Sequence, residues 1–184
     1  MSDPSPAPVP ARAEVVDLLL RSGAVRFGQF TLASGKTSDV YVDIKKAWTD
    51  PGRLRPLAAA LSARVGDAER LAGMELGAVP LVVAVALSTG LPYVVVRKAA
   101  KAHGTQQRYE GEIPSGCRVL IIEDVTTTGG SVLETVEVVR AAGGRVARVL
   151  TVVDRESGAA PALGAAGVAL ESLVTLAELR GAHR

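Results

Sequence analysis

The sequence predicts an α/β fold in which helices flank a central parallel sheet. Two observations lead to this prediction. Strand-like and helix-like segments alternate over most of the chain, and polar or glycine-rich residues directly follow several of the strand-like segments. Alternation of this kind is typical of a parallel sheet whose two faces are covered by helices. Ligands of such sheets bind at the carboxyl ends of the strands, so we expect the functional residues just after strands.

The first third of the chain contains two helical segments and one pair of short strands. A helix is predicted at residues 11–21, where apolar side chains recur on one face and a Ser-Gly pair follows. Residues 27–32 and 39–44 alternate in the manner of strands, with a turn at 33–36 between them. An amphipathic helix follows at 53–65.

From residue 70 onward, the elements alternate as a parallel sheet requires. Strands are predicted at 70–74, 93–97, 117–123, 145–154 and 167–173, and helices at 80–89, 131–142 and 176–180. The polar stretch at 98–115 has no clear periodicity, and we expect it to be a long loop. The strand pattern therefore predicts one sheet with a long insertion after its second parallel strand.

Length and composition limit the possible classes of protein. The 184 residues fit one domain, and no second large domain is expected. Apolar residues make up 48% of the chain, but the longest uninterrupted apolar run, residues 78–87, is far short of the ~20 residues of a membrane span. The net charge of +2 gives no reason to expect nucleic acid as a partner. A single cysteine, Cys117, excludes an intrachain disulfide and a cysteine-based zinc site.

The N-terminus is predicted to be a tail outside the domain. Residues 1–10 are rich in proline, which favours a loose extended segment, so the single domain is expected at 11–184. This segment lacks the basic-then-apolar pattern of a secretory signal. We therefore expect a soluble, cytoplasmic protein.

The most informative segment is Val119–Ser131, with the sequence VLIIEDVTTTGGS. A buried strand here runs into the acids Glu123 and Asp124, and a loop of threonines and glycines leads into a helix that opens at Ser131. Exposed amides and hydroxyls at a helix N-terminus bind anions, and phosphate is the expected one. The two acids beside it suit the hydroxyls of a sugar that carries the phosphate, or a metal ion bound by that phosphate.

Two other phosphate-binding motifs do not fit this segment. A Walker loop requires a lysine directly after its glycines, and none follows Gly129 and Gly130. The dinucleotide motif G-x-G-x-x-G is absent, and its acid would stand about 20 residues after the loop rather than before it. Because the acids precede the loop here, sugar and phosphate must lie close together, as in a ribose 5-phosphate.

The segment closely resembles the phosphoribosyl-pyrophosphate (PRPP) motif of the type I phosphoribosyltransferases. The resemblance implies the fold of that family, with a central parallel sheet flanked by helices and a small hood formed largely by the N-terminal segment. It implies that Glu123 and Asp124 hold the ribose hydroxyls and that the following loop cradles the 5′-phosphate. The loop residues expected to contact PRPP are Val125, Thr126, Thr127, Thr128, Gly129, Gly130 and Ser131.

Two further segments resemble the orotate-using members of that family. Residues 23–43 contain F-G-x-F-T-L-x-S-G, which in those enzymes belongs to a hood over the base, expected here at about 23–45. The Asp154-Arg155 pair matches a D-R pair whose arginine meets the orotate carboxylate, and a guanidinium fork suits a planar carboxylate. Thr127 matches a threonine that also touches orotate. Arg155 and Thr127 are therefore the expected orotate contacts.

A fourth segment resembles the catalytic loop of the same family. Residues 97–103, RKAAKAH, match R-K-x-x-K-x-H and open the polar stretch at about 98–115, which is expected to form a lid. By this resemblance the lid closes over the active site of the partner subunit in a homodimer. Its cations are expected to contact the pyrophosphate, and Lys101 and His103 to be catalytic; the four residues are Arg97, Lys98, Lys101 and His103.

The chain departs from the long bacterial members of the family at three places. Ala33 and Gly77 stand where those members carry lysines, so two potential anion-binding side chains are absent. Shorter members are similar to this chain at both positions, and the substitutions are not interpreted as a loss of activity. Tyr41-Val42 stands where those members carry a pair of aromatics. The resemblance covers roughly residues 11–179.

The resemblance implies transfer of the phosphoribosyl group from PRPP to orotate, giving orotidine 5′-monophosphate and pyrophosphate in the synthesis of UMP. Mg²⁺ is the expected cofactor, held mainly by PRPP and water rather than by protein ligands. Neither nucleic acid nor membrane is expected as a partner.

Two alternatives stay open. The PRPP motif by itself also fits a phosphoribosyltransferase for another base, such as uracil or a purine, although the hood segment and Arg155 argue against it. A PRPP-binding regulator without catalytic activity would keep the phosphate loop, but such proteins usually carry an added nucleic-acid-binding part.

Overall fold

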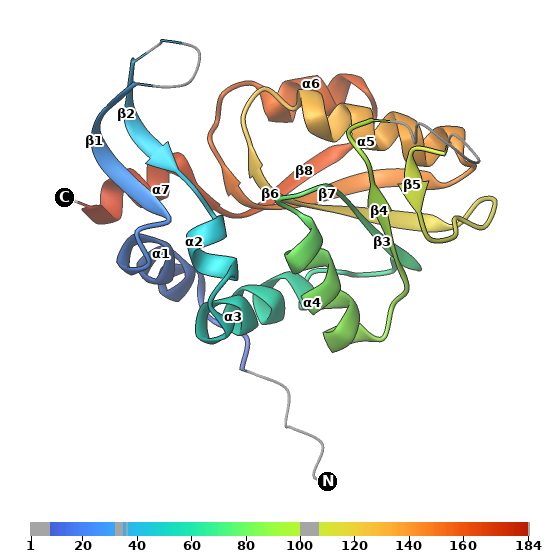
Figure 1. Cartoon of the computed structure of the whole chain (residues 1–184), viewed down its shortest axis with the longest axis horizontal. Helices are drawn as coiled ribbons and strands as arrows, with labels where there is room; N and C mark the ends of the chain where they lie inside the picture. The colour runs from blue at the N-terminus through green and yellow to red at the C-terminus, as the bar shows by residue number, and fades with distance from the viewer. Residues whose placement is uncertain (1–7, 32–34, 36, 100–106, 184) are drawn as a thin grey trace, which may run out of the picture.

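The chain folds around one six-stranded sheet. The computed structural model describes residues 8–31, 35, 37–99 and 107–183. The strands of the sheet are β3 (Arg70–Met74), β4 (Tyr93–Val96), β5 (Tyr109–Glu110), β6 (Arg118–Thr126), β7 (Arg145–Asp154) and β8 (Ala169–Thr175). They lie side by side in the order β5-β4-β3-β6-β7-β8 (Figure 1). All neighbours pair in parallel except β5, which is antiparallel to β4 at the edge.

Helices cover both faces of the sheet, as the alternating pattern predicts. One face carries α1 (Arg12–Arg21), α3 (Pro51–Ser62) and α4 (Val79–Thr89), and the other carries α5 (Gly130–Ala141) and α6 (Ala159–Ala165) (Figure 1). Successive residues of β6 point to opposite faces. Leu120 packs in the core on the α1–α3–α4 side, whereas Val119 and Ile121 pack in the core on the α5–α6 side. Burial on both faces explains why this strand is a continuous apolar run.

The N-terminal hairpin stands outside the sheet and forms the hood. Its strands, β1 (Val25–Thr31) and β2 (Thr37–Val42), pair antiparallel with Val25 opposite Val42 and Thr31 opposite Thr37. Figure 1 shows the hairpin projecting beyond the end of the sheet, beside the C-terminal helix α7 (Leu176–His183). Elements from the two ends of the chain therefore meet on one side of the molecule.

Strand order creates a crevice at the centre of the sheet. From β3 the chain crosses to β4 on one side, and it then returns to place β6 on the other side of β3. The connections that leave β3 and β6 thus run in opposite directions from neighbouring strands. Open α/β sheets bind their ligands at such a point, at the carboxyl ends of the two strands.

Several predicted boundaries are confirmed, and some elements were not predicted. The strands at 70–74 and 145–154 have the predicted bounds. Strand β6, expected to end at residue 123, continues to Thr126 because β7 pairs with it as far as Asp154. Asp124 therefore lies inside the strand with Glu123 and not after its end.

Three short elements escaped the sequence patterns. Helix α2 (Lys45–Trp48) is a single turn, too short for a helical period, and α6 is built largely of alanine and glycine. Strand β5 lies within the stretch predicted as a loop at 98–115, and its antiparallel pairing means that the sheet is not wholly parallel. In the part of the chain that the structure describes, no helix combines the length and the apolar character that crossing a bilayer requires.

Candidate active site

The predicted acid pair lies at the central crevice. The Glu123 side chain is almost fully buried, with 6% of its surface exposed, whereas Asp124 is half-buried. Burial is the main cause that raises the pKa of Glu123 to about 9, and the adjacent Asp124 carboxyl adds to the rise. Glu123 is consequently protonated at neutral pH and has a proton to donate, while its Oε1 accepts the Asp124 amide at 3.1 Å.

Asp124 lies directly against the loop that follows β3. A Cβ atom placed on Gly77 would lie 2.7 Å from the Asp124 Cγ and 2.9 Å from its Oδ1, closer than real Cβ contacts allow. Only a residue without a side chain lets the Gly77 backbone approach this carboxyl group. The loop after β3 is thus in direct contact with the carboxyl-terminal part of strand β6.

The predicted phosphate loop, residues 126–131, connects β6 to the start of α5. Thr127, Thr128, Gly130 and Ser131 are exposed at this turn. Gly129 caps α5 with a φ of 88°, a left-handed conformation that favours glycine, and a Cβ placed on it would lie 3.3 Å from the Ala159 Cα. The loop therefore presents exposed hydroxyls and amides at the positive end of a 12-residue helix.

Thr126 has a different surrounding from the rest of this loop. Its side chain is 1% exposed, and its hydroxyl donates to Asp154 Oδ1 at 3.2 Å. Its carbonyl accepts the Arg155 amide at 3.0 Å, and the Thr127 carbonyl accepts the Ala159 amide at 3.0 Å. These bonds fix the phosphate loop to the turn after β7, which carries Arg155.

Of the four predicted lid cations, two lie at the stem of the loop and two outside the described residues. Lys98 is exposed, and its charge lies close enough to counteract the rise in the pKa of Glu123. Its amide donates to Glu75 Oε1 at 2.9 Å, which ties the lid stem to the loop after β3. Arg97 is half-buried and pairs with Glu110 at 3.2 Å. Lys101 and His103 fall in the range 100–106, which the structure does not describe.

Arg155 lies on the opposite side of the phosphate loop, at the carboxyl end of β7. Its side chain is half-buried, and its Nε is buried without a hydrogen-bond partner among the residues that the structure describes. A buried donor of this kind favours an acceptor supplied by a ligand. The structure thus brings the acid pair, the phosphate loop, Lys98 and Arg155 to the carboxyl ends of neighbouring parallel strands.

Comparison with known proteins agrees with this arrangement. The sequence profile of the phosphoribosyl transferase domain matches residues 60–166. Orotate phosphoribosyltransferase of Thermococcus gammatolerans is 47% identical over 175 residues, which cover 93% of each chain. The chain belongs to the orotate phosphoribosyltransferase family. The family and the fold class predicted from the sequence are both confirmed.

Solved structures of orotate phosphoribosyltransferases share the fold over nearly the whole chain. The enzyme from Aeropyrum pernix superposes with a TM-score of 0.83 at 34% identity, covering 92% of this chain and 97% of the other. The enzyme from Mycobacterium tuberculosis H37Rv in complex with PRPP has a TM-score of 0.77 at 36% identity, covering 93% and 99%. This last relative binds PRPP.

The structure explains one of the departures from the longer orotate phosphoribosyltransferases. Because the Gly77 backbone contacts Asp124, the lysine of those relatives does not fit at this position with the backbone as it stands. A nearby cation comes from another element. Lys45, the first residue of α2, pairs with Asp43 at 2.7 Å, and the neighbouring Asp124 helps to raise the pKa of Lys45. Ala33, the other departure, lies outside the described residues.

Sequence reasoning missed several residues that support the site. Besides Lys45, these are Glu75, which accepts from the Lys98 amide, and Arg108, which links the two stems of the lid. Arg108 donates to the Arg97 carbonyl at 3.1 Å, to the Lys98 carbonyl at 2.9 Å and to Glu134 Oε1 at 2.6 Å. No local sequence pattern indicates such contacts. For the Gly77–Asp124 contact, a glycine in the short loop after β3 was a usable signal.

The residues at the crevice fit a metal ion only if substrate and water supply most of its ligands. Among residues 8–31, 35, 37–99 and 107–183, no three His, Cys, Asp or Glu side chains converge on a possible metal position. Asp124 offers a half-buried carboxylate beside the phosphate loop, whereas the neighbouring Glu123 is almost fully buried. Divalent hard cations accept such a mixed set of oxygen ligands.

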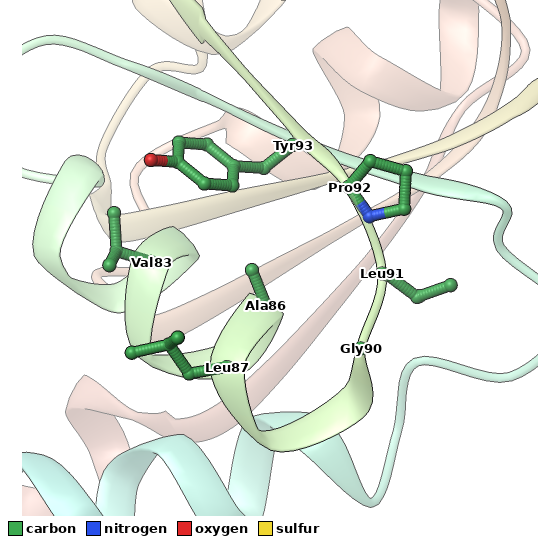
Figure 2. Close-up of a pocket in the computed structure, with 7 residues that line it drawn as sticks. All are labelled: Val83, Ala86, Leu87, Gly90, Leu91, Pro92 and Tyr93. Atoms are coloured by element: carbon green, nitrogen blue, oxygen red, sulfur yellow. The ribbon is translucent and has the colours of Figure 1, made fainter.

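An apolar pocket lies at the amino ends of the strands, whereas this site lies at their carboxyl ends. It has a volume of about 440 Å³ and is formed by the C-terminal half of α4 and the start of β4 (Figure 2). Tyr93 is the first residue of β4, so the pocket marks the amino end of that strand. Leu87 in its wall is 83% exposed. Because this pocket lies at the amino end of β4, it is not the crevice in which the acid pair lies.

Proposed function

We propose that this chain transfers the 5-phosphoribosyl group from PRPP to orotate, giving orotidine 5′-monophosphate and pyrophosphate. The observation that supports the proposal most strongly is the grouping of sugar-binding acids, phosphate loop and Arg155 around one crevice. An enzyme of this specificity needs these groups together, because its two substrates meet at the anomeric carbon of one ribose. The wider role in UMP synthesis follows from the product.

The acid pair and the phosphate loop orient PRPP. The loop amides and the hydroxyls of Thr127, Thr128 and Ser131 hold the 5′-phosphate at the N-terminus of α5. Protonated Glu123 donates a hydrogen bond to a ribose hydroxyl oxygen. The Asp124 carboxylate accepts hydrogen bonds from the ribose hydroxyls. Arg155, with Thr127, binds the orotate carboxylate on the other side of the same loop. The ring nitrogen of orotate is thereby aimed at the anomeric carbon.

Catalysis requires stabilisation of charge as pyrophosphate departs. The bond from the anomeric carbon to the pyrophosphate oxygen breaks while the bond to the ring nitrogen forms, and the ribose becomes similar to an oxocarbenium ion. The lid cations Arg97, Lys98, Lys101 and His103 neutralise the leaving group, with Lys101 and His103 as the catalytic residues. Mg²⁺, held mainly by PRPP and water near Asp124, supplies further positive charge when bound.

A panel of bases tests the proposal. Orotate consumption is followed by ultraviolet absorbance with PRPP and Mg²⁺, beside uracil, adenine and hypoxanthine. We expect turnover with orotate alone, dependent on both PRPP and the metal. Turnover with another base and not with orotate would overturn the roles of the hood and Arg155. PRPP binding without turnover of any base would favour a regulator.

We further propose that the chain acts as a homodimer in the cytoplasm, with the lid of one subunit over the site of its partner. The apolar pocket on α4 and β4 supports a second copy as its occupant. Helix α4 is apolar nearly all round, and its exposed side carries Val83 and Leu87. A helix of this composition is expected to be covered on all sides. Leu87→Glu should lower the mass measured by light scattering, whereas the exposed control Val9→Glu should not.

Mixed dimers test whether the lid acts across subunits. Lys101→Ala and Arg155→Ala subunits are each expected to be nearly inactive. A heterodimer of the two contains one site with an intact Arg155 and an intact lid from its partner. An equal mixture that is unfolded and refolded should therefore recover about a quarter of the wild-type activity, by statistical pairing in a two-fold dimer. No recovery would show that each lid serves its own subunit.

A further inference from the structure

The C-terminal helix α7 connects two parts of the proposed orotate site. Its Arg180 donates two hydrogen bonds to Asp39 of hood strand β2, from Nη1 to Oδ2 and from Nη2 to Oδ1, both at 2.7 Å. Such a bidentate pair fixes the relative orientation of its two side chains as well as their distance. The hood is thereby held at one place along α7.

Aromatic contacts strengthen the same junction. The Arg180 guanidinium lies 5.6 Å from the centre of the Phe27 ring, and the ring of His183 lies 4.6 Å from that of Phe27. Phe27 belongs to β1, so α7 contacts both strands of the hood. Figure 1 shows α7 directly beside the hairpin.

The first turn of α7 is hydrogen-bonded to the turn that carries Arg155. Its Ala177 amide donates to Glu156 Oε2 at 2.8 Å, and the Glu156 amide donates to Asp154 Oδ1 at 2.9 Å. Glu156 directly follows Arg155 and has a φ of 54°, a conformation unusual for a residue with a side chain. Helix α7 therefore forms a strut between the hood and the base-binding arginine.

The Arg180 pair also keeps Asp39 charged. The Arg180 hydrogen bonds are the main reason that the pKa of the Asp39 carboxyl lies below its usual range. Without Arg180, hood strand β2 loses the bidentate contact that joins it to α7.

We propose that Arg180 is a positioning residue for base recognition, which sets the hood relative to the turn that carries Arg155. This inference rests on the proposed function and adds a determinant of orotate affinity from the end of the chain. Arg180 itself is not assigned a contact with either substrate. Its effect is expected in the KM for orotate and not in the KM for PRPP.

The test compares Arg180→Ala with a matched variant on the same helix. Arg12 makes an equivalent bidentate pair with Glu178 of α7, at 2.5 and 2.7 Å, but joins that helix to α1 and not to the hood. We expect Arg180→Ala to raise the KM for orotate about three- to five-fold, in the range of an exposed charged pair. The KM for PRPP should change less than two-fold, and Arg12→Ala should leave both values within two-fold of wild type.

Three outcomes would overturn the inference. These are an unchanged KM for orotate in Arg180→Ala, an equal rise in both KM values, and the same rise in Arg12→Ala, which would make α7 a general support. Arg180→Lys keeps the charge without the fork and is expected to fall between wild type and Arg180→Ala. Circular dichroism of each variant verifies folding. Failure of the wild-type enzyme to use orotate would refute the proposed function instead, so the two failures are distinguishable.

Discussion

Gly77→Ala tests whether the contact between the loop after β3 and strand β6 sets the position of Asp124. Gly77 is not among the glycines with positive φ, so the backbone itself tolerates alanine. The added Cβ would lie 2.7 Å from the Asp124 Cγ, and ordinary contacts begin at 3.4 Å. The Asp124 Oδ2 would lie closer still, so the carboxyl group or the loop must move by about 1 Å.

A displacement of this size is large for a group that orients a sugar. Misplacement by ~1 Å can cost about 100-fold in rate, so we expect kcat/KM for PRPP to fall about 10- to 100-fold, or ~1.4 to 2.7 kcal/mol of transition-state stabilisation. Initial rates at saturating orotate and varied PRPP give this ratio. Isothermal titration with PRPP, in the absence of orotate, shows whether binding is lost with it.

The matched control is Gly164→Ala in α6. No atom lies within 4 Å of a Cβ built at Gly164, and its φ is not in the left-handed region. The same chemical change there should leave kinetics unaltered and raise the free energy of unfolding by up to about 1 kcal/mol, because alanine is the better helix former. Wild-type kcat/KM for PRPP in Gly77→Ala would refute the idea that the close approach of Gly77 positions Asp124.

Three further predictions concern the acids and cations of the site. Arg155→Ala should raise the KM for orotate about 10- to 100-fold, the value of a charged hydrogen-bond pair, while the KM for PRPP stays constant; equal losses for both substrates would show that Arg155 supports the fold. Lys101→Ala should lower kcat about 30- to 1,000-fold with little change in orotate affinity, and an unaltered kcat would contradict the lid role. The raised pKa of Glu123, about 9 against 4.5, means that the folded state holds a proton that the unfolded state releases, so the free energy of unfolding should fall as pH rises from about 5 to 9. Glu123→Gln should remove that decline in denaturant titrations at pH 5, 7 and 9, and parallel curves for the two proteins would exclude a buried, protonated Glu123.

The features that the sequence predicts well are local ones. An apolar run, two acids, a glycine pair and a helix start lie within 13 consecutive residues at Val119–Ser131, so their order alone indicates the phosphate loop. Helices such as α1 and strands such as β3 follow from periodicity within one segment. One failure of prediction also has a local cause, because α2 has too few residues to show a helical period.

Long-range contacts could not be predicted in the same way. Gly77 and Asp124 touch although they are far apart in sequence, and the length of β6 depends on its pairing with β7. The burial that keeps Glu123 protonated arises from the layers packed on both faces of the sheet. The junction of Asp39 with Arg180 joins residues 141 positions apart.

The sequence by itself determined the class of fold, the phosphate loop and the resemblance to orotate phosphoribosyltransferases, because each is written in short, contiguous patterns. Only the tertiary structure decided which of these patterns face one another. The order β5-β4-β3-β6-β7-β8 places the carboxyl ends of β3 and β6 side by side. Strand order depends on the balance of packing over the whole core, and local residue patterns carry little information about it.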